Sequence, residues 1–111
     1  MNALVKEPVV WIDVGPLTDV PVRGARRVPT PRGDVAVFRT GDGALYALLD
    51  RCPHKGGPLS QGIVHGRKVT CPLHAFTIDL ASGEPVGADA GKGCAPKVEV
   101  RVEAGRILLA G

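Results

Sequence analysis

Two short cysteine–histidine motifs constrain this chain of 111 residues more than any other feature. Cys52 and His54 form a Cys-x-His motif; after sixteen intervening residues, Cys71 and His74 form a Cys-x-x-His motif. Two thiolates and two imidazoles are a complete ligand set for a metal centre. Because the chain contains only three Cys and three His, this arrangement predicts a metal site held by two loops.

The way in which the ligand types are paired separates the candidate metal centres. A structural zinc site uses the same ligands, but its usual spacings place Cys near Cys and His near His. Here each motif supplies one sulfur and one nitrogen, which suits a Rieske [2Fe–2S] centre, where two Cys bind one iron and two His bind the other. Zinc remains the alternative metal. A catalytic Cys–His pair would not require the second motif.

The two motifs resemble the ligand loops of the Rieske iron–sulfur family, which have the same Cys-x-His and Cys-x-x-His form. The resemblance implies a [2Fe–2S] cluster whose ligands are Cys52, His54, Cys71 and His74. We assign no catalytic residues.

Apolar runs separated by turn residues predict an all-β chain, with no sustained helical period. The clearest hairpin has strands at 34–39 and 44–49 around Gly41-Asp42-Gly43, because Asp-Gly suits a tight turn. A second hairpin is expected over 62–70, turning at His65-Gly66, where it would hold the two ligand loops side by side. Other predictions are strands at 9–14, closed by Gly15-Pro16, and at 75–80, a terminal hairpin at 98–103 and 106–109, and a Pro-rich loop over 17–31 with at most a short strand around Arg27-Val28.

These elements predict a Rieske-type antiparallel β-sandwich base with an inserted cluster-binding subdomain. The base would comprise the chain before Cys52 and after His74. We expect residues 1–111 to form a single domain, with the subdomain at about 51–75.

Composition narrows the possible partners and the compartment. The net charge is only +3 and aromatic residues make up 4% of the chain, so we expect no nucleic-acid binding. The first eight residues lack the features of a signal peptide, and no apolar run is long enough to span a bilayer. We therefore expect a cytoplasmic protein without membrane contact.

The remaining candidate residues have simpler interpretations. Cys94 is expected to be a free thiol in a turn, and His65 an exposed turn residue. The group Arg23, Arg26 and Arg27 is interpreted as surface charge. Exposed cations near the ligand loops, namely Lys55, Arg67 and Lys68, are candidates for a docking rim.

The chain is too short for a second cofactor domain, so we predict a one-electron carrier or an electron-transfer subunit rather than a complete enzyme. Residues 80–91, with Ser82-Gly83-Glu84 and Gly87-Ala88-Asp89, resemble the small subunit of NAD(P)H-dependent assimilatory nitrite reductase. That resemblance implies a large sirohaem- and flavin-containing subunit as the redox partner. The alternative is the Rieske ferredoxin of an aromatic-ring dioxygenase system, whose partners are a ferredoxin reductase and an oxygenase.

The resemblance also indicates a reduction potential in the lower part of the Rieske range. High-potential relatives carry an extra Cys in each ligand loop and a Ser two residues after the second His. Here residues 55–60 and 73–77 contain no Cys, and Phe76 occupies the Ser position. Fewer hydrogen bonds to the cluster sulfurs stabilise the reduced state less.

Overall fold

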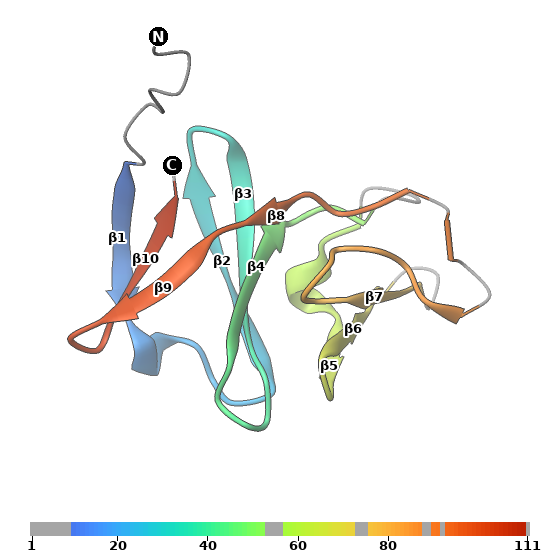
Figure 1. Cartoon of the computed structure of the whole chain (residues 1–111), viewed down its shortest axis with the longest axis horizontal. Helices are drawn as coiled ribbons and strands as arrows, with labels where there is room; N and C mark the ends of the chain where they lie inside the picture. Colours follow the sequence, from blue (N-terminus) through green and yellow to red (C-terminus); the bar gives the residue numbers. More distant parts are fainter. Residues whose placement is uncertain (1–9, 53–56, 73–75, 88–89, 92, 111) are drawn as a thin grey trace, which may run out of the picture.

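The computed structural model describes residues 10–52, 57–72, 76–87, 90–91 and 93–110. Over these residues it contains β-strands and two short 3-10 turns, with no α-helix. The strands form three antiparallel sheets (Figure 1), which confirms the predicted all-β antiparallel class. Their orders and bounds are β1-β10-β9 (Trp11–Pro16, Arg106–Ala110, Val100–Glu103), β2-β3-β4-β8 (Gly24–Thr30, Gly33–Arg39, Leu45–Leu49, Lys97–Val98) and β5-β6-β7 (Ile63–His65, Lys68–Thr70, Thr77–Asp79).

Strand β3 lies between two hydrophobic cores. Successive side chains of a strand point to opposite faces, so Val35 and Val37 enter one core while Ala36 and Phe38 enter the other. The first core, shared with Ile107 and Leu109, joins the first and second sheets into the base. The second core joins the second sheet to the third and contains Cys52 and Cys71. All four of these β3 residues are at most 1% exposed, as expected for a strand covered on both faces.

The hairpin predicted around Gly41-Asp42-Gly43 is present as β3 and β4. The terminal hairpin is present as β9 and β10, but its first strand is shared between two sheets. Lys97 and Val98 pair with β4, whereas the residues from Val100 onward pair with β10. The chain therefore crosses from the second sheet to the first at Glu99.

The N-terminal strand continues further than the sequence indicated. Gly15-Pro16 was expected to end it, yet β1 pairs with β10 through Pro16, with a register shift between Asp13 and Gly15. Gly15 adopts φ +127 and donates its N–H to the Asp13 carboxylate at 3.0 Å. This local irregularity accommodates Gly15 and Pro16 within the strand, so β1 does not end before them.

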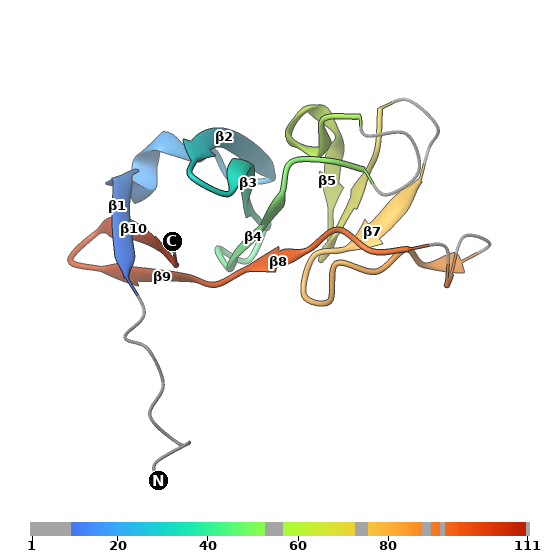
Figure 2. The same ribbon diagram turned by 90° about the horizontal axis from the view of Figure 1, so that it is seen from above.

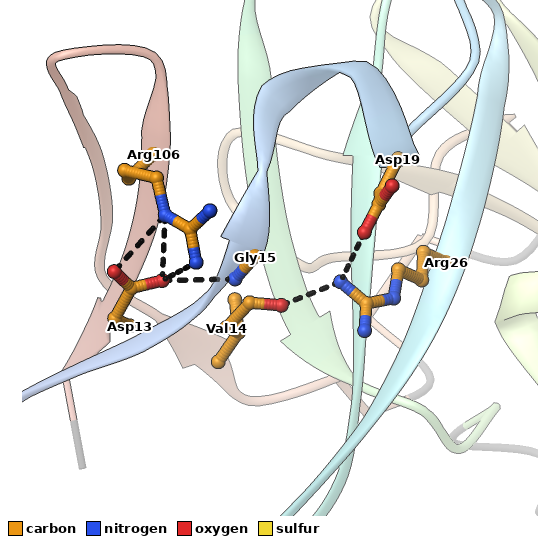
Figure 3. Close-up of polar contacts among 6 residues, drawn as sticks. All are labelled: Asp13, Val14, Gly15, Asp19, Arg26 and Arg106. Atoms are coloured by element: carbon orange, nitrogen blue, oxygen red, sulfur yellow. Dashed lines mark hydrogen bonds and ion pairs between the residues drawn. The ribbon is translucent and has the colours of Figure 1, made fainter.

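Charged side chains fix β1 to its neighbours (Figure 3). Arg106 of β10 donates to the Asp13 carboxylate, and Arg26 donates to the Val14 carbonyl at 2.5 Å and pairs with Asp19 at 3.4 Å. Asp19 belongs to the 3-10 turn η1 (Leu17–Asp19). The interpretation of Arg26 as simple surface charge is therefore wrong, because this side chain connects β2 to β1 and η1.

The prediction of a loop over 17–31 is also wrong for its second half. Strand β2 pairs with β3 along its whole length, from Gly24 opposite Arg39 to Thr30 opposite Gly33. The Pro residues suggested a loop, but β2 is an edge strand, where a missing backbone N–H is tolerated.

The third sheet lies beside the base in both views (Figures 1 and 2). The strand after His74 was placed in the base, and this placement is wrong, because β7 pairs with β6 from Lys68–Asp79 to Thr70–Thr77. An isolated bridge between Ile78 and Pro85 extends the same unit. The third sheet thus continues past residue 75, the expected end of the subdomain. The short apolar run at 75–80 does not itself specify which sheet it joins.

Candidate metal centre

The first ligand loop begins where β4 ends and is closed by a backbone hydrogen bond. Cys52 is 1% exposed, and its N–H donates to the Gly57 carbonyl at 2.8 Å. The 3-10 turn η2 (Leu59–Gln61) follows at once, and Leu59 is fully buried. The loop is therefore attached to the core at both ends.

The second ligand loop connects β6 to β7 and is closed in the same way. Cys71 is 1% exposed, and its N–H donates to the Phe76 carbonyl at 2.7 Å. In both loops the Cys N–H thus bonds to the carbonyl five residues ahead. Phe76 itself is buried, so its aromatic side chain packs the C-terminal end of this loop into the apolar core.

The β5–β6 hairpin is present as predicted and brings the described ends of the two loops close together. Ile63, shortly after η2, pairs with Thr70, the residue before Cys71. The approach is close at Gly62, where an added Cβ would lie 2.4 Å from the Thr70 carbonyl oxygen. Only a residue without a side chain fits there.

Cys52 and Cys71 belong to the same buried cluster, together with Phe38, Leu48 and Phe76 among others. Two thiols on adjacent loops, inside one apolar core, suit a cluster that is bound on one side by sulfur and shielded from water. His54 and His74 lie outside the described residues. The structure therefore brings the two predicted sulfur ligands together, and the histidine ligands remain a prediction.

The other Cys and His residues lie elsewhere. Cys94 is exposed, in agreement with its interpretation as a thiol in a turn. His65 ends β5, is exposed, and its Nε2 and Thr70 Oγ1 share a hydrogen bond of 2.7 Å. Arg67 lies in the turn of the β5–β6 hairpin and Lys68 begins β6, while Lys55 lies outside the described residues, so the docking rim stays a prediction.

A family comparison agrees with this geometry. Residues 10–99 match the family model described as "Rieske [2Fe-2S] domain". The chain belongs to the Rieske [2Fe–2S] domain family. A protein of this family carries a Rieske [2Fe–2S] cluster and transfers electrons, and the alternative of a structural zinc site is not supported.

Similar proteins include members of several redox systems. A putative NADH-dependent nitrite reductase small subunit from Mycobacterium tuberculosis has a TM-score of 0.84 and 27% identity, covering 95% of this chain and 97% of that chain. A chain from the complex of oxygenase and ferredoxin in carbazole 1,9a-dioxygenase has a TM-score of 0.82 and 30% identity, covering 94% and 95%. The 4beta-methylsterol monooxygenase of Methylococcus capsulatus is 44% identical over 57 residues, which are 51% of this chain and 15% of that protein.

Sequence reasoning missed the polar side chains at the bases of the ligand loops. Asp50 and Ser60 flank the first loop and are hydrogen-bonded to each other. Thr70 and Thr77 flank the second, with their Oγ1 atoms 3.2 Å apart. The one available signal was position, since each of these polar residues lies just outside a ligand motif.

Among the described residues, no helix has the length and apolar character needed to cross a bilayer.

Proposed function

We propose that Cys52 and Cys71 bind one iron of the Rieske cluster and that His54 and His74 bind the other. The support for the sulfur ligands is that both thiols are buried in one core at the bases of adjacent loops. The support for the nitrogen ligands is the spacing of the two motifs.

The chain offers a matched control for each ligand type. C52S and C71S should abolish the visible spectrum of the cluster, as should H54Q and H74Q, whereas C94S and H65Q should retain two irons and two acid-labile sulfides per chain. Full loss of the cluster in C94S or H65Q would refute the assignment, as would its retention in any of the four ligand variants.

The protein itself contributes binding and shielding. A bound cluster would supply one-electron redox chemistry. Phe76 and Leu59 are buried beside the two cysteines and exclude water from the sulfur side. A dry environment around a redox centre limits solvent rearrangement and tunes its potential.

We further propose that this protein is the cytoplasmic small subunit of an NAD(P)H-dependent assimilatory nitrite reductase. The observation that carries this proposal is the segment after the second ligand loop, with Gly83-Glu84 followed by Gly87-Ala88-Asp89. The structural similarity of this chain to a putative nitrite reductase small subunit, over nearly the whole of both chains, supports the proposal. The proposed partner is a large subunit that contains sirohaem and flavin.

The second candidate is a Rieske ferredoxin of an aromatic-ring dioxygenase system. The comparable similarity to a chain of the carbazole dioxygenase complex favours this alternative. Reconstitution with purified partners separates the two. Stimulation of NAD(P)H-dependent nitrite reduction by a large sirohaem and flavin subunit supports the first. Reduction by a ferredoxin reductase with turnover of a ring-hydroxylating oxygenase, and no effect on nitrite reduction, supports the second.

A further inference from the structure

A buried carboxylate lies two residues before the first predicted ligand. The Asp50 side chain is 0% exposed, although it follows the end of a strand, where a solvated turn residue would be ordinary. It accepts hydrogen bonds from the Ser60 N–H at 2.7 Å, the Ser60 hydroxyl at 2.5 Å and the Arg27 Nε at 3.0 Å. A buried carboxylate is costly unless it is paired, and three donors are what make this one tolerable.

These bonds connect the two ends of the first ligand loop. Asp50 precedes Cys52, and Ser60 lies in η2, immediately after the loop. The Asp50 N–H donates to the Asp34 carbonyl at 2.8 Å, and Arg27 also pairs with the Asp34 carboxylate at 3.3 Å. The two ends of the loop are therefore bonded to each other, and they are also bonded to the β2–β3 hairpin of the β-sandwich base.

Arg27 is exposed, in agreement with its interpretation as surface charge, and it also joins this network. Its side chain is 51% exposed, but its guanidinium group bonds to a fully buried carboxylate. Removing the Arg27 guanidinium group would leave the buried Asp50 carboxylate without its full set of hydrogen bonds, which costs more than the bond itself contributes.

We propose that Asp50 and Ser60 are positioning residues for the first ligand loop, which hold Cys52 and its neighbours in the geometry that binds the cluster. This inference rests on the proposed assignment of Cys52 and His54 as ligands. Asp50 acts through the loop and not on the iron, because its oxygens are occupied by Ser60 and Arg27.

Ser60 allows the most direct test. S60A removes the hydroxyl donor and leaves the backbone donor in place, whereas S60T restores a hydroxyl. D50N keeps the size of the side chain and removes its charge. S82A is the matched control, because the Ser82 hydroxyl oxygen also makes a local hydrogen bond, which it accepts from the exposed Glu84 N–H at 3.2 Å.

Three readouts follow the loop in the cluster-loaded protein. They are the rate at which a chelator removes iron, the g-values of the reduced cluster in electron paramagnetic resonance, and hydrogen–deuterium exchange of the peptide over residues 49–61. We expect iron release to be about tenfold faster in D50N and several-fold faster in S60A, as for the loss of hydrogen bonds to a charged group. S60T and S82A should match the wild type. D50N and S60A should also shift or broaden the g-values and increase exchange in the peptide.

The outcomes distinguish this inference from the proposed function. Unchanged release, spectrum and exchange in both S60A and D50N would overturn the positioning role while leaving the cluster assignment intact. If D50N does not fold, the comparison of S60A with S60T decides. If the wild type binds no [2Fe–2S] cluster, the proposed ligand assignment fails, and exchange in the peptide still reports whether Ser60 holds the loop.

Discussion

The backbones of Gly83 and Ala95 are in direct contact. The Ala95 N–H donates to the Gly83 carbonyl at 2.7 Å, and a Cβ added to Gly83 would lie 2.1 Å from the Ala95 carbonyl oxygen. Ala95 is buried just before β8, and Gly83 follows β7. This contact therefore closes the connection by which the chain leaves the third sheet and returns to the second.

We predict that G83A is strongly destabilising. Gly83 has φ +77, so Ala there carries backbone strain and also collides with Ala95. G87A is the matched control, because Gly87 has φ +68 and nothing within 4 Å of an added Cβ. Thermal unfolding of the loaded protein should show G83A to be less stable than G87A by about 1–3 kcal/mol, the usual cost of overpacking. Equal losses in the two variants would contradict the close contact.

A pair of leucines tests the two-core arrangement. Leu48 and Leu109 are both fully buried, Leu48 in the core that contains the cysteines and Leu109 in the core of the base. L48A and L109A should each lower the free energy of unfolding by about 2–5 kcal/mol. Only L48A should also accelerate loss of the cluster at temperatures well below unfolding, measured by the decay of visible absorbance. Equally fast loss in L109A would show that the cores are not distinct in this respect.

The pKa of Asp13 depends on Arg106. Hydrogen bonds from the Arg106 guanidinium, followed by the Gly15 N–H, hold the pKa of Asp13 below its usual value of 3.8. R106Q should therefore raise this pKa toward 3.8, measured by a carboxyl carbon NMR titration. R101Q, which removes an arginine paired with Glu103, should leave it unchanged.

The same shift predicts an effect on acid stability. A carboxyl group with a lowered pKa in the folded state stabilises the fold above its unfolded-state pKa, and this contribution is lost as the pH falls through the folded-state value. R106Q should therefore lose less stability than the wild type between about pH 4 and pH 2. The difference should diminish in high salt, since both side chains are about half exposed. A larger acid loss in R106Q would contradict the linkage.

We predict a reduction potential below zero. Phe76 is buried at the position where high-potential relatives carry a hydrogen-bonding Ser, so this loop lacks that donor to sulfur. A redox titration monitored by visible absorbance gives the value, and about +200 mV or higher would be inconsistent with this expectation. F76S should have a higher potential than F76A, since the two variants open similar space and only one provides a hydroxyl group.

The elements that could be predicted from the sequence are those specified locally. The turn at Gly41-Asp42-Gly43 and the alternating residues of the terminal hairpin are encoded within a few positions, and so is the placement of Cys52 directly after a strand. Strand β2 was missed because its Pro residues disfavour a strand except at an edge, and edges are decided by pairing between distant segments.

Long-range pairing also limits what can be predicted of the site. The motif spacing led to the two buried cysteines, but Asp50 resembles any polar residue that ends a strand and Ser60 any polar residue after a turn. The burial of Asp50 and its hydrogen bonds to Ser60 arise only when η2 packs against β2 and β3. The pairing of β7 with β6 could not be predicted for the same reason, since a strand of three residues does not specify which strand it pairs with.

Strand β3 has one further consequence, for cooperativity. A strand whose alternate residues fill two cores cannot melt on one side alone, because its backbone hydrogen bonds and both sets of side chains are lost together. The base and the third sheet, which the second core joins to it, should therefore unfold in a single transition. An isolated fragment of either should not be a stable module.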